Sequence, residues 1–127
     1  MSENESSMCS GPGYFSWNEL VTTDVAGATA FYSGLLGWTT TPFSPEYTLF
    51  QKADQSVGGL MKSPRPGMPA QWVSYVSVED VDATAAKAAE LGGQVVLPPM
   101  DVTDVGRIAV LLDPQNAPIG IFKPMAG

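Results

Sequence analysis

The chain alternates between two hydrophobic patterns, one typical of strands and one typical of helices. Tyr14 to Thr22 is rich in aromatic and β-branched residues, which predicts a strand. Val25 to Leu36 has its apolar residues on one helical face; Asp24 suits an N-cap before it, and Gly37 suits a stop after it. Three shorter strands are expected next, around 39–41, 47–52 and 57–62, with a turn at 54–56.

The same succession begins again after a Pro/Gly stretch, Ser63 to Pro69, which has no periodicity and is interpreted as a boundary. Trp72 to Val78 predicts a strand, Asp80 is a second N-cap candidate, and the alanine-rich segment Val81 to Leu91 favours a helix. Gly92-Gly93 ends it. Further strands are expected at 94–97, 107–112 and 118–123, with a turn at 113–116.

Spacing supports an internal repeat. The interval between the capping aspartates, Asp24 and Asp80, is identical to the interval between Gly37 and Gly93. Gly59 and Gly120 in the closing strands are slightly farther apart than this, so a longer loop is expected at Pro98–Gly106. A chance likeness between two unrelated αβ segments is the alternative.

Composition and charge narrow the range of partners. The 127 residues fit one domain, and 44% are hydrophobic, which is enough for a packed core. The net charge of −7, without a cluster of Lys and Arg, argues against binding to nucleic acid or to an anionic membrane. The acidity is compatible with a cationic ligand, or it simply keeps the protein soluble.

The N-terminal residues and the single cysteine bear on localisation. Residues 1–12 have neither an apolar stretch nor a basic start, so we expect a disordered tail and no signal peptide. Cys9 lies in this tail and cannot form an internal disulfide. No apolar run approaches the roughly 18 residues of a spanning helix. These features predict a cytoplasmic protein.

Both halves resemble the glyoxalase / bleomycin-resistance / extradiol-dioxygenase group, the vicinal oxygen chelate superfamily. The resemblance rests on these segments: Trp17-Asn18-Glu19-Leu20, Asp24, Phe31-Tyr32 and Leu36-Gly37-Trp38, then Val78-Glu79-Asp80-Val81-Asp82-Ala83, Glu90-Leu91-Gly92-Gly93, Gly106-Arg107 and Asp113-Pro114. It implies an α+β fold of two βαβββ modules, about 13–63 and 70–124, within one domain over 13–127. Their mixed sheet would curl around a cup with the helices outside, and such chains often pair as homodimers.

Metal enzymes of this superfamily place His, Gln or Glu at four inward-facing strand positions. Those positions fall on Trp17, Val73, Gly59 and Gly120, and the chain contains no histidine. Glu19, two residues after Trp17 on the same strand face, is the one nearby candidate, and one carboxylate does not make a metal site. We therefore expect no metal and no cofactor, and metal-dependent glyoxalase or dioxygenase chemistry is not expected.

The resemblance and the alternation of strand residues predict what lines the cup. Successive residues of a strand point to opposite faces of the sheet, so one set of aromatic and apolar side chains is expected on the inward face. An apolar, aromatic lining is typical of a small-molecule site. The expected ligand-binding residues are Trp17, Glu19, Met61, Tyr75, Arg107 and Phe122. Alternatively, Trp17 only fills space, Glu19 is a partly solvated residue paired with a basic side chain, and Arg107 ties down the preceding loop.

Glu19 is the candidate catalytic residue, because burial beside an indole is expected to raise the pKa of its carboxyl and suit it to acid–base work. Three functions remain open. The first is a metal-free protein that binds a planar or cationic metabolite or drug. The second is a metal-independent lyase, isomerase or hydroxylase-like enzyme that uses Glu19, and the third is a degenerate domain that assembles with partners.

Overall fold

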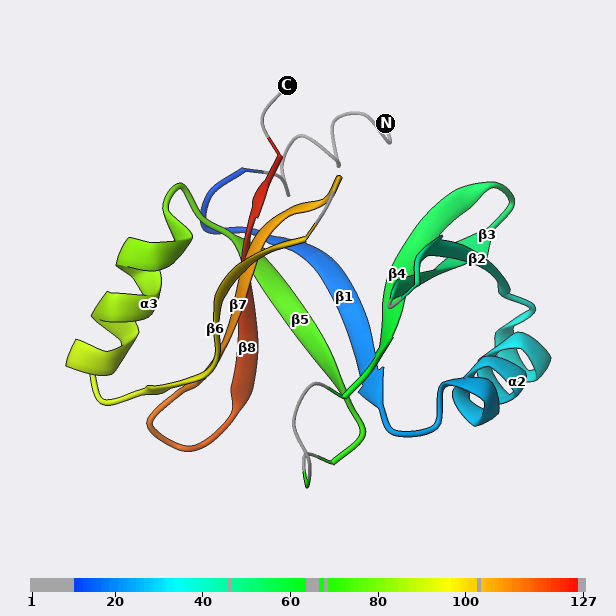
Figure 1. Ribbon diagram of the computed structural model, residues 1–127, viewed down its shortest axis with the longest axis horizontal. Coiled ribbons are helices and arrows are strands. Elements are labelled where there is room, and N and C mark those ends of the chain that lie inside the picture. The colour runs from blue at the N-terminus through cyan, green and yellow to red at the C-terminus, as the bar shows by residue number, and fades with distance from the viewer. Residues whose placement is uncertain (1–10, 46, 64–66, 68, 103, 126–127) are drawn as a thin grey trace. The chain divides into compact units, whose positions relative to one another are not determined.

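The computed structural model describes residues 11–45, 47–63, 67, 69–102 and 104–125 (Figure 1). Cys9 and most of the expected N-terminal tail lie outside the described residues, as does part of the boundary segment. The chain divides into two compact units. One is Trp17–Val73, called here the first-half unit; the other is Met1–Ser16 with Ser74–Gly127, called the second-half unit.

The first-half unit contains one helix and four hydrogen-bonded strands in the order β2-β3-β4-β1, with β1 parallel to β4 and the other neighbours antiparallel. The core residues Leu20, Phe50 and Leu60 lie on the side of the sheet covered by the helix, where Val25, Ala28 and Tyr32 of α2 pack against them. The elements are β1 (Phe15–Thr22), α2 (Val25–Leu36), β2 (Thr39–Ser44), β3 (Tyr47–Lys52) and β4 (Gln55–Lys62).

Aromatic side chains extend this core toward α2. Tyr32 of the helix stacks on Trp38, with ring centroids 6.0 Å apart, and meets Phe50 edge-on at 5.9 Å. The indole nitrogen of Trp72 donates a hydrogen bond of 3.0 Å to the Tyr32 hydroxyl. One side of α2 is therefore fixed to the sheet through a helix residue with four aromatic neighbours, Phe31 included.

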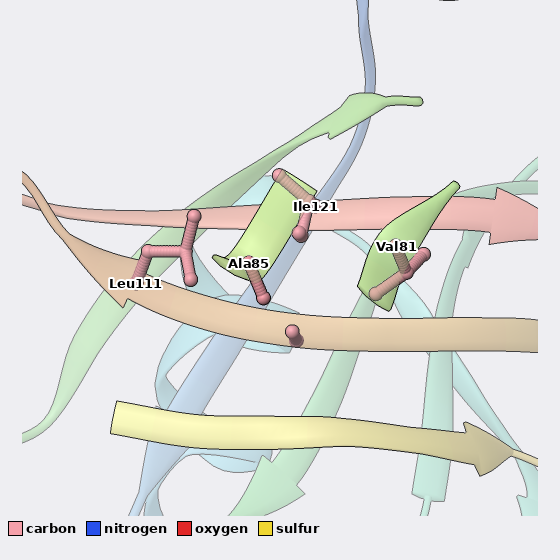
Figure 2. Close-up of a cluster of buried hydrophobic side chains, with 5 residues drawn as sticks. Val81, Ala85, Leu111 and Ile121 are labelled. Atoms are coloured by element: carbon pink, nitrogen blue, oxygen red, sulfur yellow. The ribbon is translucent and has the colours of Figure 1, made fainter. Parts of the chain in front are cut away.

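The second-half unit repeats this arrangement, with strands in the order β5-β8-β7-β6 and β5 parallel to β8. Val81 and Ala85 of the helix pack on Leu111 and Ile121 of the sheet, and Ala109 completes the cluster (Figure 2). The elements are β5 (Gln71–Ser77), α3 (Val81–Glu90), β6 (Gln94–Val102), β7 (Gly106–Leu112) and β8 (Pro118–Pro124).

Both helices begin at the aspartates predicted from the sequence as N-caps. An Asp24 carboxylate oxygen accepts a hydrogen bond of 2.9 Å from the backbone N–H of Gly27, and Asp80 accepts one of 3.0 Å from Ala83. Gly37 ends α2 in the left-handed conformation, with φ 73°. The expected α+β succession of two βαβββ modules is confirmed.

The prediction of a loop over Pro98–Gly106 is wrong. β6 continues through both prolines to Val102, with irregular pairing to β7 on either side of Leu97. Pro is tolerated there because β6 is the last strand of its unit's order and the pairing is bulged. The turn expected at 54–56 lies instead at Ala53-Asp54, whose positive φ angles of 50° and 69° fit a two-residue hairpin.

Within the described part of the chain, neither helix has the length and apolar character needed to cross a membrane.

Replacing Asp80 by Ala removes the acceptor for an amide of the first turn of α3. We expect the free energy of unfolding to fall by about 1 kcal/mol. Asp80→Ser, which keeps a capping oxygen, should lose less. Urea denaturation monitored by circular dichroism measures both variants, and equal losses for Ala and Ser would contradict the capping role.

Candidate ligand-binding site

Glu19 is a carboxylate buried on the first-half sheet, with only 4% of its surface exposed. It lies in β1 directly beside Gly59 of the parallel strand β4, and Leu49 of β3 is paired with the same glycine. Paired residues of neighbouring strands share a face, so these three lie on one side of the sheet. Leu20, the next residue along β1, points to the helix side and its core.

Tyr47 of β3 provides the donor for this carboxylate. Its hydroxyl hydrogen-bonds Glu19 and accepts a 2.8 Å hydrogen bond from the indole N–H of Trp17. Because an indole N–H only donates and a carboxylate only accepts, the chain runs from Trp17 through Tyr47 to Glu19. These three residues are called here the indole–phenol–carboxylate relay.

Burial, followed by the charge of Glu19, raises the pKa of the Tyr47 phenol well above its ordinary value of 10.0. The phenol therefore stays protonated near neutral pH and can act as a hydrogen-bond donor. Trp17 and Tyr47 are half-buried, whereas Glu19 is buried.

A glycine makes room for this arrangement. A Cβ atom built on Gly59 would overlap the hydroxyl and ring of Tyr47, which leans diagonally across the sheet from its own pairing partner, Met61. The phenol thus occupies the space that a side chain at position 59 would take. Sequence reasoning missed Tyr47; the available signal was an aromatic residue in a strand next to a strand glycine.

The second-half unit makes the equivalent arrangement with a different residue. Tyr75 of β5, which takes the place of Glu19 in the repeat, is paired with Gly120 of β8, and its ring covers that glycine so closely that a Cβ would overlap it. Ser77 is paired with Phe122 on the same face. Tyr75 and Phe122 therefore lie on one face of the sheet, as the sequence predicts. The side chain of Tyr75 is buried, with 1% of its surface exposed.

Arg107 lies on the other face of the second-half sheet, in register with Ala109 and Leu111 of the helix-side core. Its Nε and Nη2 donate hydrogen bonds of 2.9 Å to the two carboxylate oxygens of Asp82 in α3, and its Nη1 donates one of 3.0 Å to Asp101. The hydrogen bonds from Arg107 hold the pKa of Asp82 below its usual range. This clamp joins α3 to β6 and β7; ligand binding by Arg107 stays a prediction.

An open hollow of about 450 Å³ lies beside this clamp, where β6 and β8 end and β7 begins. Arg107 and Lys123 line it together with the carboxylates of Asp101 and Asp104, so its charges largely offset one another. It contains none of the relay residues.

The residues at the four positions where the resemblance predicts metal ligands do not fit a metal ion. The indole of Trp17 and the side chain of Val73 offer no ligand, and tyrosine side chains fill the space above Gly59 and Gly120. The chain has no histidine, and in the described ranges no three Cys, Asp or Glu side chains gather as a metal site requires.

Comparison with known proteins identifies the family. Residues 14–121 match the model of the Glyoxalase/Bleomycin resistance protein/Dioxygenase superfamily. The chain is 45% identical over 116 residues to CFP32 of Mycobacterium bovis, provisionally named a glyoxylase, and this covers 88% of the chain and 44% of the relative. It is 35% identical to the anthracycline biosynthesis protein DnrV of Streptomyces peucetius, covering 88% and 47%.

The fold matches as well. A variant of homoprotocatechuate 2,3-dioxygenase from B. fuscum superposes with a TM-score of 0.60 at 22% identity, over 88% of this chain and 32% of the dioxygenase. The protein therefore belongs to the Glyoxalase/Bleomycin resistance protein/Dioxygenase superfamily and has its glyoxalase-like α+β fold. The chain spans about half the length of the curated relatives it matches.

Gly59→Ala should displace Tyr47 and lower the free energy of unfolding by about 1–3 kcal/mol, because the new Cβ overlaps the phenol. The matched control is Gly34→Ala in α2, where nothing lies within 4 Å of the new Cβ, and there stability should hold or rise. Urea denaturation measures both. A Tyr47→Ala/Gly59→Ala variant in which the two losses simply add would show that the residues do not compete for this space.

Tyr47→Phe tests the phenol through pH. Because the pKa of Tyr47 is raised in the folded protein, its contribution to stability is complete below pH 10 and is lost as pH rises further. Above pH 10 the wild type should lose up to about 1.4 kcal/mol per pH unit more than Tyr47→Phe. Urea denaturation from pH 7 to 11 checks this. A stability difference between the two proteins that is constant over that range would contradict it.

Proposed function

We propose that this protein binds a planar or cationic small molecule at the indole–phenol–carboxylate relay of the first-half unit. The observation that carries the proposal is the buried Glu19 carboxylate, 4% exposed, which is hydrogen-bonded to Tyr47 and through it to Trp17, both half-buried. A planar ligand can stack on the indole and the phenol. A ligand cation or N–H group can take the place of the Tyr47 hydroxyl on the carboxylate, and Met61 lies beside Tyr47 on the same face.

The relatives support a planar ligand. DnrV is named an anthracycline biosynthesis protein. Anthracyclines are flat, fused-ring compounds, and those with an amino sugar also carry a positive charge, so one molecule combines both features that the relay can recognise. The net charge of −7 favours the approach of a cation. Tyr75, Phe122 and Arg107 remain proposed as further ligand-binding residues.

An acid–base enzyme is the second candidate. Tyr47 is a protonated donor in contact with Glu19, an acceptor, so the relay holds both partners of a proton transfer next to each other. Glu19 would take a proton from a substrate, and Tyr47 would stabilise the oxygen anion that results. Such a reaction would be an isomerisation or elimination carried out by protein groups alone.

A cytoplasmic location and the pairing of two copies are likewise proposed.

Glu19→Gln separates the contributions to binding. The amide keeps an oxygen that accepts from Tyr47 but loses the charge, so affinity for doxorubicin should fall at least tenfold, about 1.4 kcal/mol. Affinity for the uncharged aglycone should change less than about threefold. Isothermal titration calorimetry without added metal gives both values, and circular dichroism checks folding.

Trp17→Phe is the companion variant. It should weaken doxorubicin and the aglycone to a similar degree, because both present the same rings. If neither compound binds the wild-type protein, or if Glu19→Gln and Trp17→Phe leave both affinities unchanged, the relay is not the binding site. Turnover of a compound that is lost in Glu19→Gln while its binding persists would favour the enzyme.

A further inference from the structure

One cross-strand row joins the relay to the outer strand of the first-half sheet. Thr41 of β2 is paired with Leu49 of β3, Leu49 with Gly59 of β4, and Gly59 with Glu19 of β1. Paired residues of neighbouring strands share a face, so all four lie on the side opposite the one that α2 covers. Because strands lie about 4.8 Å apart, Thr41 is about 10 Å from Gly59, where the Tyr47 phenol lies.

The far end of this row is polar. The Thr41 hydroxyl donates a hydrogen bond of 2.6 Å to the side-chain oxygen of Gln51. Gln51 lies two residues after Leu49 in β3 and therefore on the same face of the sheet. Because Thr41 holds the amide oxygen, the amide nitrogen of Gln51 is directed away from that hydroxyl and presents N–H donors. Thr41 is exposed and Gln51 half-buried, so a ligand can reach them; the two are called here the outer polar pair.

The middle of the row is apolar. It consists of the half-buried Leu49 and of Gly59, which has no side chain. A fused-ring compound can lie over Leu49 and keep its polar groups at the two ends, an arrangement typical of small-molecule sites with few polar contacts. The two ends recognise different groups. The relay contains the carboxylate of Glu19, which attracts a cation, whereas the amide N–H of Gln51 requires a hydrogen-bond acceptor.

We propose that Gln51 determines ligand specificity by donating a hydrogen bond to a ring carbonyl, while the cationic end of the same ligand binds at the relay. This inference rests on the proposed function and narrows its ligand class. The ligand is a fused-ring compound with an ammonium group at one end and a carbonyl oxygen toward the other, as in an amino-substituted quinone. Thr41 is a positioning residue, because its hydroxyl holds the amide in the orientation that presents the N–H groups.

A matched pair of ligands isolates the carbonyl group. 2-(Aminomethyl)anthraquinone and 2-(aminomethyl)anthracene have the same number of fused rings and the same ammonium group, but only the anthraquinone has ring carbonyls. The ratio of their affinities is measured by isothermal titration calorimetry without added metal. In the wild type this ratio should favour the anthraquinone about fivefold more than it does in Gln51→Leu, which is the usual contribution of one neutral hydrogen bond.

Two further substitutions separate the donor from its support. Gln51→Glu keeps an oxygen for the Thr41 hydroxyl but has no N–H, so its affinity ratio should fall as far as that of Gln51→Leu. Thr41→Val removes the hydroxyl that holds the amide and should lower the ratio, whereas Thr41→Ser keeps a hydroxyl and should retain it. Circular dichroism verifies that each variant is folded.

The matched control is Gln94→Leu, which removes an exposed strand glutamine in the second-half unit and should leave the affinity ratio unchanged. Glu19→Gln should weaken both compounds to a similar degree, because both carry the ammonium group. An affinity ratio that is the same in Gln51→Leu as in the wild type overturns the role of Gln51 and leaves the relay in place. If neither compound binds the wild type, the proposed function fails, and this inference fails with it.

Discussion

The site depends on one constraint: a carboxylate buried on a sheet must have a hydrogen-bond donor, and the donor must have room. Glu19 obtains its donor from Tyr47, and Tyr47 obtains its room from Gly59, whose missing side chain leaves the space that the phenol fills. Trp17 then donates to the same hydroxyl, which orients it toward Glu19. An unpartnered carboxylate at this depth would lose its charge or destabilise the fold.

The two halves meet the same geometric requirement with different chemistry. Each has a glycine in its closing strand, and each covers that glycine with a tyrosine: Tyr47 over Gly59, and Tyr75 over Gly120. In the second half the tyrosine occupies the position equivalent to Glu19 itself, so that half has no carboxylate there. The repeat therefore keeps its shape, while only the first half places a carboxylate beside its closing-strand glycine. The resemblance to the superfamily predicts metal-ligand positions at these two glycines, and a glycine has no side chain that could bind a metal.

The two helices also differ in chemistry although they occupy equivalent positions in the repeat. α3 follows the rule of a surface helix: it has two buried apolar residues, and its Asp82 accepts hydrogen bonds from Arg107 of the sheet. α2 is fixed on one side by the stacked rings of Tyr32 and Trp38 and is apolar on the other. One repeated module thus has a charged helix in one half and an uncharged helix in the other.

The sequence by itself determined the order of elements, because caps, glycine stops and hydrophobic period are local signals: Asp24, Asp80 and Gly37 lie where they were expected. It also determined that Trp17 and Glu19 share a strand. Local signals could not show that β6 runs through two prolines, since only its bulged pairing with β7 makes this tolerable. The tertiary structure alone brought Tyr47 to Glu19 and placed Arg107 on the helix side, because strand pairing and diagonal contacts join residues that lie far apart along the chain.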